Sequence, residues 1–536
     1  MDGKREKNLQ NGGRFIFCLS KTMAEQDRRP TGTANGGVVI EGPHQSQCCS
    51  KLRELFGIDL RSLAVFRICT AFLILVDLLL RSRFIEANYT DAGVLPRTLV
   101  DPHHPFFFLH SMSGAYSFQC LCFILTAVFT VMLLVGYRTT LATVAVWFLL
   151  ACMQFRNPFL LDGQDILPRQ LLFWSMFLPL GARFSIDARR NPQKRRNDTS
   201  VLSAASVALL CQFVFVYVTG GLVKTSPDWQ AGTVLDVVLS NQNWTLPFGQ
   251  FLLQFPQWVL KLLTWGVLYL EIFGPFLMFL PVCTGPTRML TICAFWILQL
   301  GFGLSIELRL FPFISSLATL PFIPVWFWNK VGTRVREHPE NEIPVPTESG
   351  SPTLGAGSHR WLIRVREGVV CLFLLFATLL NLHTIGIWTE AKWLRLPDRI
   401  TKLDLGYYIG MNQNWNMYAG PVTHEPTYVL IGTQRDGTEL EFLKTPGDAD
   451  WEKVRRLHGS YRFRLLHGPI IRLSKRYGTP PHVYLDWLCR KWNTGKMDDQ
   501  KLASIKVFCD LRDIRPGKPG QLVRKLVVEH QYSSES

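Results

Sequence analysis

Ionisable side chains inside apolar stretches are the residues of this chain best placed to do chemistry. Arg67 and Asp77 fall within the apolar segment 62–81, and Glu271 falls within the apolar segment 257–281. A charge in the bilayer interior is costly, so such residues mark proton or ion pathways, substrate sites or structural ion pairs. Arg67 and Asp77 are about 15 Å apart along one helix and cannot pair with each other. We expect Arg67, Asp77 and Glu271 to be structural charges that pair with other helices, and a transporter's polar path is the alternative.

The composition excludes two classes of protein. Hydrophobic residues make up 48% of the 536 residues and charged residues only 18%, with a mean hydropathy of +0.13. A soluble domain does not need so much apolar surface, and a disordered chain would not carry 16 Trp and 37 Phe. We predict a mostly α-helical, polytopic membrane bundle of about nine spans, with a small lumenal α+β C-terminal domain. The predicted spans lie near 62–81, 116–136, 139–155, 170–183, 203–222, 257–281, 289–306, 311–328 and 368–388.

Loop topology, rather than nucleic-acid binding, accounts for the net charge of +16. Loops on one side of the predicted bundle carry about twice as many Lys and Arg as the opposite loops, and positive loops face the cytosol. We therefore predict a multi-pass protein of the endoplasmic reticulum or another endomembrane, with a cytosolic N-terminus and a lumenal C-terminus. The sequons at Asn88 and Asn243 fall in lumenal loops and are predicted to be glycosylated, whereas Asn197 is predicted to be cytosolic and unmodified.

The distribution of apolar residues divides the chain into three regions. Residues 1–54 are polar and basic and are typical of a disordered cytosolic tail. Residues 55–388 hold the spans, and within them 329–360 are rich in Pro, Gly and Ser, which favours a flexible cytosolic loop. Residues 389–536 are predicted to form the lumenal α+β domain, which ends in a polar tail.

The lumenal domain shows a predicted hairpin and two helical patterns. Strand-like runs at Tyr428–Ile431 and Leu440–Leu443 flank a turn at Arg435-Asp-Gly437, and helical patterns follow near 449–475 and 482–492. Cys489 and Cys509 are the cysteines of this region. In an oxidising lumen they are expected to form a disulfide, and two buried thiols are the alternative.

The sequence predicts no metal site, because no Cys or His spacing matches a zinc motif. His103 and His104 are adjacent in the first lumenal loop. They are followed by Phe106-Phe-Phe108, which is more typical of an interfacial segment with aromatic anchors than of a metal site.

Several motifs resemble the vitamin K-dependent gamma-carboxylases and their relatives with the horizontally transferred transmembrane (HTTM) domain. They are Ser62-Leu-Ala-Val-Phe-Arg67 with Asp77 after it, Tyr89-Thr-Asp91-Ala-Gly-Val-Leu-Pro-Arg97, Arg156-Asn-Pro158, Ser185-Ile-Asp187, Gly220-Gly-Leu-Val-Lys224-Thr-Ser-Pro-Asp228-Trp229, Asn414-Trp-Asn-Met-Tyr418 and Tyr484-Leu-Asp-Trp487. The resemblance covers roughly residues 55–495. It implies a bilayer enzyme that uses vitamin K hydroquinone or another quinol and acts on a lumenal peptide or protein.

The resemblance gives Lys224 a role. In the carboxylases, a lysine five residues before the tryptophan of the Asp-Trp motif deprotonates vitamin K hydroquinone, and Lys224 stands at that spacing before Trp229. A lysine at the end of an apolar helix is desolvated, which lowers its pKa and makes a neutral amine available as a base. The alternative is a lysine that extends to the membrane interface.

This chain departs from the carboxylase pattern at three positions. Asp165 stands where the carboxylases have a functional His, Gln299 stands near a second family His, and Pro96 replaces a cysteine that bridges to their lumenal domain. We expect Asp165 to take part in catalysis through a proton transfer of its own, or to form a charge pair with Lys224. The alternative function is a non-enzymatic HTTM protein that helps lumenal proteins to mature or fold.

Overall fold

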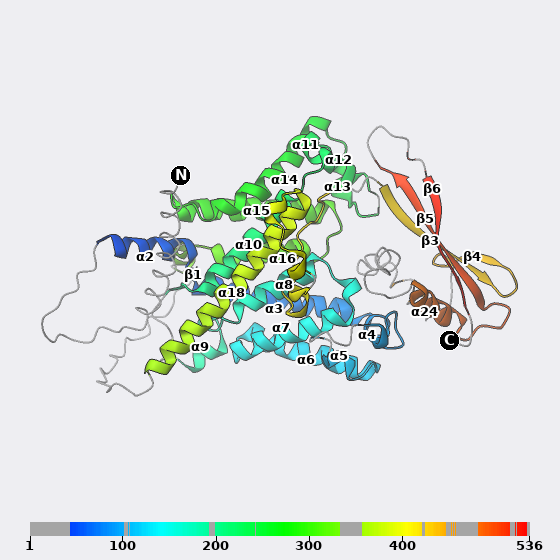
Figure 1. Cartoon of the computed structure of the whole chain (residues 1–536), viewed down its shortest axis with the longest axis horizontal. Helices are drawn as coiled ribbons and strands as arrows, with labels where there is room; N and C mark the ends of the chain where they lie inside the picture. Colours follow the sequence, from blue (N-terminus) through cyan, green and yellow to red (C-terminus); the bar gives the residue numbers. More distant parts are fainter. Residues whose placement is uncertain are drawn as a thin grey trace.

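The computed structural model describes residues 43–100, 106, 108–191, 199–241, 243–332, 356–401, 403–420, 424–445, 452, 454, 456, 481–514, 520 and 522–532. Within these residues the chain is mostly helical, with a four-stranded sheet near the C-terminus, so the predicted fold class is confirmed. The helices form an elongated bundle, and the sheet lies beyond one end of it (Figure 1). Helix α2 lies at the opposite end.

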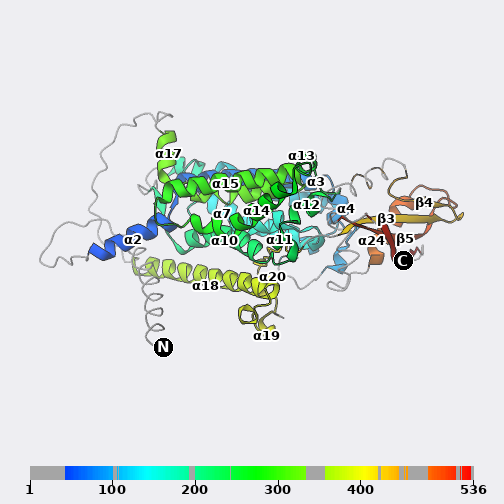
Figure 2. The same cartoon turned by 90° about the horizontal axis from the view of Figure 1, so that it is seen from above.

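Seven of the described helices are long and apolar enough to cross a membrane. They are α3 (Leu60–Ser82), α6 (Tyr116–Val135), α7 (Thr139–Arg156), α10 (Ala204–Leu222), α14 (Gln257–Leu277), α15 (Thr284–Ser305) and the part Trp361–Trp388 of α18 (Ala356–Trp388). Figure 2 shows α18 running along one side of the bundle, where it packs against α10. The chain is therefore an integral multi-pass membrane protein.

Two of the nine predicted spans are not continuous helices. Segment 170–183 contains only the end of α8 (Gly163–Ser175), whose 13 residues extend about 20 Å, short of the roughly 30 Å of a bilayer core. Segment 311–328 bends by 91° between Phe311–Phe322 and Val325–Gly332. Ile323 is extended at this bend because it precedes a proline, which disfavours helical geometry. The count is therefore seven spans, or eight if the bent pair is one span.

Residues 163–187, which begin with α8, nevertheless connect the region of Leu310 to the turn between α6 and α7. Near the start of α8, Gln164 Oε1 accepts a 3.2 Å hydrogen bond from the amide of Leu310. Beyond its end, the amide of Asp187 donates to the carbonyl of Gly136 over 3.0 Å, in the turn between α6 and α7. Nearly all of α8 is buried, so its surroundings are protein rather than lipid.

The remaining elements of the membrane domain are short. They are α4 (Ile85–Tyr89), η1 (Arg97–Leu99), α5 (Phe108–Ser111), η3 (Pro158–Leu160), α9 (Ile186–Arg190), α11 (Pro227–Ala231), α12 (Val234–Leu239), α13 (Pro247–Leu252), α16 (Phe311–Leu317), η5 (Leu320–Phe322), α17 (Val325–Gly332), η6 (Lys392–Leu394), α19 (Asp398–Thr401), α20 (Leu405–Tyr408), and the paired strands β1 (Ile58–Asp59) and β2 (Ser200–Val201).

Helix α2 (Pro43–Phe56) occupies the last part of the predicted disordered tail. Arg288 Nη2 donates a 2.6 Å hydrogen bond to the carbonyl of Leu55, which holds the end of α2 against α15. Residues 43–54 are therefore helical rather than disordered. Residues 1–42, Asn197, and 333–355 of the predicted flexible loop lie outside the described residues.

The C-terminal domain is an antiparallel sheet with one helix packed on it. The strands are β3 (His424–Gln434), β4 (Glu439–Glu441), β5 (Leu502–Asp513) and β6 (Leu522–Gln531), in the order β4-β3-β5-β6. The β3–β4 pairing confirms the predicted hairpin, and α24 (Pro481–Asn493) confirms the predicted helix. The predicted polar tail instead contains β5 and β6. Most of the predicted helix 449–475 lies outside the described residues.

Residues 410–418 return from the last span into the bundle. Arg169 Nε and Gln170 Nε2 of α8 both donate to the carbonyl of Gly410, at 3.0 and 3.1 Å. Gln413 Oε1 accepts from Gln212 Nε2 of α10 at 2.8 Å, and Trp415 is fully buried. These contacts fix an irregular segment inside the membrane domain, where its backbone polar groups have protein partners.

Candidate functional site

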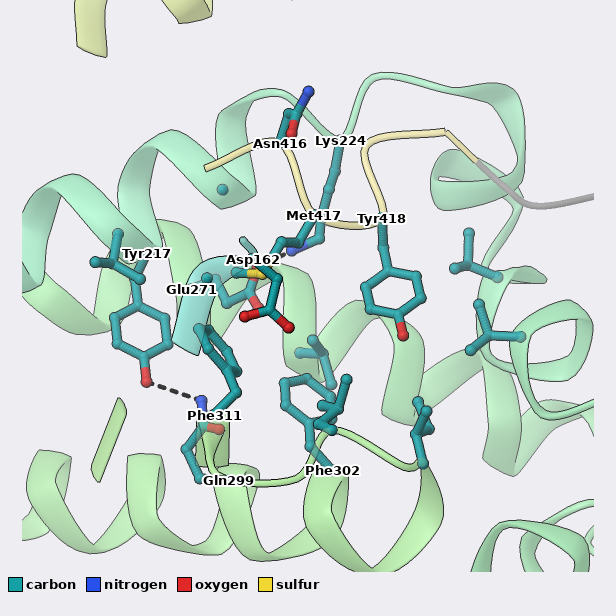
Figure 3. A pocket seen from close by; sticks show the side chains of 18 of the residues that line it. Asp162, Tyr217, Lys224, Glu271, Gln299, Phe302, Phe311, Asn416, Met417 and Tyr418 are labelled. Atoms are coloured by element: carbon teal, nitrogen blue, oxygen red, sulfur yellow. Dashed lines mark hydrogen bonds and ion pairs between the residues drawn. The ribbon is translucent and has the colours of Figure 1, made fainter. Parts of the chain in front are cut away.

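A cavity of about 450 Å³ lies where α8, α10, α14 and α15 meet the returning segment 414–418. Its walls are mostly apolar side chains, which suits an apolar ligand of moderate size. Figure 3 shows the polar side chains that face it. Among them are Asp162, Tyr217, Lys224, Glu271, Gln299 and Tyr418.

Lys224 stands just beyond α10, and its amine enters the cavity. The Lys224 amine forms an ion pair with the Glu271 carboxylate, and both side chains are more than nine-tenths buried. The same amine lies 5.1 Å from the ring centroid of Trp229, a distance suited to a cation–π contact. Lys224 therefore does not extend to the membrane interface.

The glycine before the end of α10 allows this ion pair to form. A Cβ atom on Gly221 would lie 2.6 Å from Cγ1 of Ile272 and 3.4 Å from Cβ of Glu271. Only glycine therefore lets α10 approach α14 so closely. This approach brings the end of α10, with Lys224, next to Glu271, whose position in the middle of α14 gave no sequence signal for its partner.

Asp165 does not lie beside Lys224, so the predicted charge pair between them is wrong. Its carboxylate binds Arg81 and accepts a 3.1 Å hydrogen bond from the amide of Asp162. This second contact belongs to a capping box, in which Asp162 and Asp165 close the first turn of α8. The cap directs Asp165 into the protein interior, and Asp162, which the sequence analysis missed, lines the cavity instead.

The two other intramembrane charges, Arg67 and Asp77, have protein partners that differ from those expected. Asp77 accepts from Arg81 of its own helix at 2.7 Å, and Arg81 also reaches Asp165. Arg67 donates to the carbonyls of Leu180 and Phe184, at 3.0 and 2.5 Å, in the chain after α8. Neither Arg67 nor Asp77 lines the cavity, so the three charges do not form one polar path.

The segment Asn414–Tyr418 closes the cavity. Asn414, Asn416, Met417 and Tyr418 all line it. The indole N–H of Trp229 donates a 2.8 Å hydrogen bond to the carbonyl of Tyr418, which ties this segment to α11. Two motifs that lie almost two hundred residues apart in the sequence therefore meet at one site.

Gln299 and Tyr217 form a second polar contact on the cavity wall. Gln299 Nε2 donates to the Tyr217 hydroxyl at 2.9 Å (Figure 3). Gln299 is 2% exposed, and its Oε1 has no hydrogen-bond partner within the part of the chain that the structure describes. Position 299 therefore belongs to the cavity, although a glutamine replaces the histidine usual in the carboxylases.

The predicted modification sites have different surroundings. Asn88 is only 5% exposed, so the folded chain has no room for a glycan there, whereas Asn243 is exposed. Cys489 and Cys509 are both buried and are not joined by a disulfide. Burial raises the pKa of the Cys489 thiol to about 12, which makes it unreactive at neutral pH.

No group of three or more His, Cys, Asp or Glu side chains within the described ranges could hold a metal ion. His103 and His104 lie outside those ranges. Among the described residues, the cavity brings together an amine, two carboxylates, two phenols and three side-chain amides within mostly apolar walls.

Comparison with known proteins assigns part of the chain to a family. The HTTM domain matches residues 57–327, which include the cavity residues of α8, α10, α14 and α15 but not the segment 414–418. No curated protein and no solved structure matches the chain. Because the matched region covers half of the sequence and contains the helices of the bundle, the chain belongs to the HTTM domain family.

Proposed function

We propose that this protein is a membrane-embedded enzyme in which Lys224 acts as a base on a quinol bound in the cavity. The observation that carries the proposal is a buried amine, paired with a single buried carboxylate, at the wall of an apolar cavity. The substrate class, by resemblance to the carboxylases, is vitamin K hydroquinone or another quinol. The reaction is the carboxylation of a lumenal peptide or protein, or a related base-catalysed step.

Glu271 gives Lys224 a route to the neutral form that a base requires. An ammonium has no lone pair, so Lys224 must release a proton before it can accept one, and Glu271 is the acceptor in contact with it. Proton transfer from Lys224 to Glu271 would replace the ion pair by two neutral groups. The lone pair of the neutral amine could then accept the proton of a phenolic hydroxyl.

The apolar walls of the cavity serve the same reaction. They would hold the ring of a quinol and exclude water, so that the phenolate formed by proton abstraction is not reprotonated from solvent. Helices α11 and α12, which carry the cavity-lining residues Trp229 and Val234, lie toward the end of the bundle next to the C-terminal sheet (Figure 1). That arrangement supports a lumenal substrate in an endomembrane, with the N-terminus in the cytosol.

The test is incorporation of labelled carbon dioxide by membranes that contain the protein, with vitamin K hydroquinone and a Glu-rich peptide. Lys224→Ala is expected to lose the incorporation that the wild type shows. Lys491→Ala is the matched control, because Lys491 forms an ion pair with Glu86 at 2.8 Å on the outside of the protein. No incorporation by the wild type above empty membranes, or equal incorporation by Lys224→Ala, would contradict the proposal.

One observation favours a second candidate function. The Lys224–Glu271 pair also satisfies both charges as they stand, as in a cavity that only binds a lipid or an apolar peptide segment. A non-enzymatic helper for the maturation or folding of lumenal proteins would use the cavity in this way. It predicts that Asn416→Ala impairs binding of a client protein whereas Lys224→Ala does not, measured by co-purification.

A further inference from the structure

The backbone of Tyr418 is held in a conformation that tyrosine rarely adopts. Its φ angle is +56°, in the left-handed region, where a Cβ atom is strained against the neighbouring carbonyl. Non-glycine residues in this region persist only where surrounding contacts enforce them, and they concentrate at functional sites.

The contact that enforces this conformation comes from Trp229. Its indole N–H donates to the Tyr418 carbonyl at 2.8 Å, and Trp229 itself is only 5% exposed. The same ring lies beside the Lys224 amine. Trp229 therefore fixes the backbone of Tyr418 and the position of Lys224 together.

The strained backbone sends the Tyr418 ring into the cavity (Figure 3). Its hydroxyl has no hydrogen-bond partner among the residues that the structure describes. Burial raises the pKa of Tyr418 to about 12, so the group stays a neutral phenol and can donate a hydrogen bond at physiological pH. A polar group in an apolar cavity costs stability unless it finds a partner.

A second unpartnered atom faces the same cavity. Gln299 is almost completely buried and its Oε1 has no partner in the described part of the chain. Two polar groups left open in one cavity indicate that a bound molecule supplies their partners. Because Tyr418 and Gln299 come from different segments, the two observations are independent.

We propose that Tyr418 is a ligand-contacting residue whose hydroxyl donates a hydrogen bond to an oxygen atom of the bound quinone or quinol, and that Trp229 is its positioning residue. The inference rests on the proposed function for its ligand class. It adds a donor on a segment that lies outside the matched HTTM region.

The test measures binding without turnover. The probe is tritium-labelled vitamin K quinone, the oxidised form, which has no phenolic proton for Lys224 to remove. It is added to the purified full-length chain in lipid nanodiscs. Tyr418→Phe is expected to raise the dissociation constant about three- to tenfold, as for the loss of one neutral hydrogen bond. Tyr408→Phe is the matched control, since Tyr408 is exposed and does not line the cavity.

A double-mutant cycle separates positioning from general stability. Trp229→Phe keeps a ring beside Lys224 but loses the N–H that holds Tyr418. It is expected to weaken probe binding in the wild-type background and to have almost no further effect in Tyr418→Phe. A purely structural role of Trp229 would give additive effects, which would overturn the positioning claim.

Two other outcomes would overturn the proposal: wild-type protein that does not bind the probe, and Tyr418→Phe protein that binds it as tightly as the wild type. A failure of the proposed function looks different. In that case Tyr418-dependent binding would remain, but carboxylation would be absent or independent of Lys224.

Discussion

Two buried ion clusters of this protein have similar chemistry and opposite surroundings. In the first, Arg81 binds Asp77, Asp165 and the hydroxyl of Tyr89, and none of these groups lines the cavity. In the second, Lys224 binds one carboxylate, that of Glu271, and both face the cavity. The first cluster is saturated by protein partners, whereas the second leaves space next to the amine.

This difference separates a cluster that links helices of the bundle from one that has room for a ligand. A guanidinium with several fixed partners cannot take up or release a proton at any useful pH and serves as a crosslink between α3 and α8. An amine with one carboxylate partner can exchange a proton with it and then with a ligand. We therefore propose that Arg81 and Asp165 stabilise the bundle and that Lys224 and Glu271 are the groups that react.

Arg81→Met is expected to have the largest effect on stability. It removes the cation that pairs with Asp77 and with the buried Asp165, which should lower the free energy of unfolding by about 3–5 kcal/mol. Thermal unfolding of detergent-purified protein measures the change. Arg435→Met is the control, because its ion pair with Asp498 is exposed and should contribute little to the free energy of unfolding. Equal melting temperatures of the two variants would show that Arg81 does not stabilise the fold more than an exposed ion pair does.

His110 should make the folded protein less stable at acidic pH. Burial lowers the pKa of His110 to about 4, and its Nδ1 lies 2.6 Å from Oε1 of Gln119. The unfolded chain therefore binds a proton more readily than the folded one. Stability is complete above about pH 6.5 and falls by about 3 kcal/mol as the pH drops to about 4.

Thermal unfolding between pH 7 and pH 4.5 measures this effect. His110→Gln, which cannot titrate, should lose less stability over the same range than the wild type does. Identical pH profiles for the two proteins would show that other groups cause the acid response.

Glu271→Gln tests whether Glu271 takes the proton of Lys224. Glutamine cannot take the proton of Lys224, so quinol-dependent activity at neutral pH should fall about ten- to a hundredfold. The measurement is the rate of carbon dioxide incorporation per folded molecule at neutral pH. An unchanged rate would mean that Glu271 does not take the proton of Lys224.

The smallest effect is expected at the sequons. Asn243 is exposed, so Asn243→Gln should remove one glycan and change the melting temperature little. Asn88 is buried, so Asn88→Gln should leave the glycosylation state unchanged. Mobility on a gel before and after glycosidase treatment measures both. A glycan on Asn88 would show that this part of the fold is more open than the structure indicates.

The sequence predicted those parts of the fold that depend on local patterns. Hydropathy and turn residues were sufficient to predict the seven long apolar helices, the β3–β4 hairpin and α24. Strands β5 and β6 were not, because β6 is exposed over most of its length and its alternation is masked by charged residues. The sequence predicted a membrane span at 170–183, several residues beyond the start of α8. Apolar residues continue past the end of α8 at Ser175, which accounts for this shift.

The sequence predicted individual residues of the candidate site but not the contacts between them. The resemblance identified Lys224, Trp229 and the segment 414–418, and the structure places them together. It could not identify Glu271 as the partner of Lys224, because that contact depends on the close packing of α10 against α14 at Gly221. It misjudged Asp165, since the capping box that turns Asp165 away from the cavity depends on its contact with Arg81.

The central claim is that Lys224 does chemistry and Asp165 maintains the fold. The most direct test is quinol-dependent carbon dioxide incorporation by Lys224→Ala and Asp165→Asn, each normalised to the amount of folded, monodisperse protein. We expect Lys224→Ala to accumulate as folded protein and to lose about 100- to 10,000-fold in activity. We expect Asp165→Asn to yield less folded protein with activity per folded molecule close to that of the wild type. Folded Asp165→Asn without activity, together with active Lys224→Ala, would contradict the account.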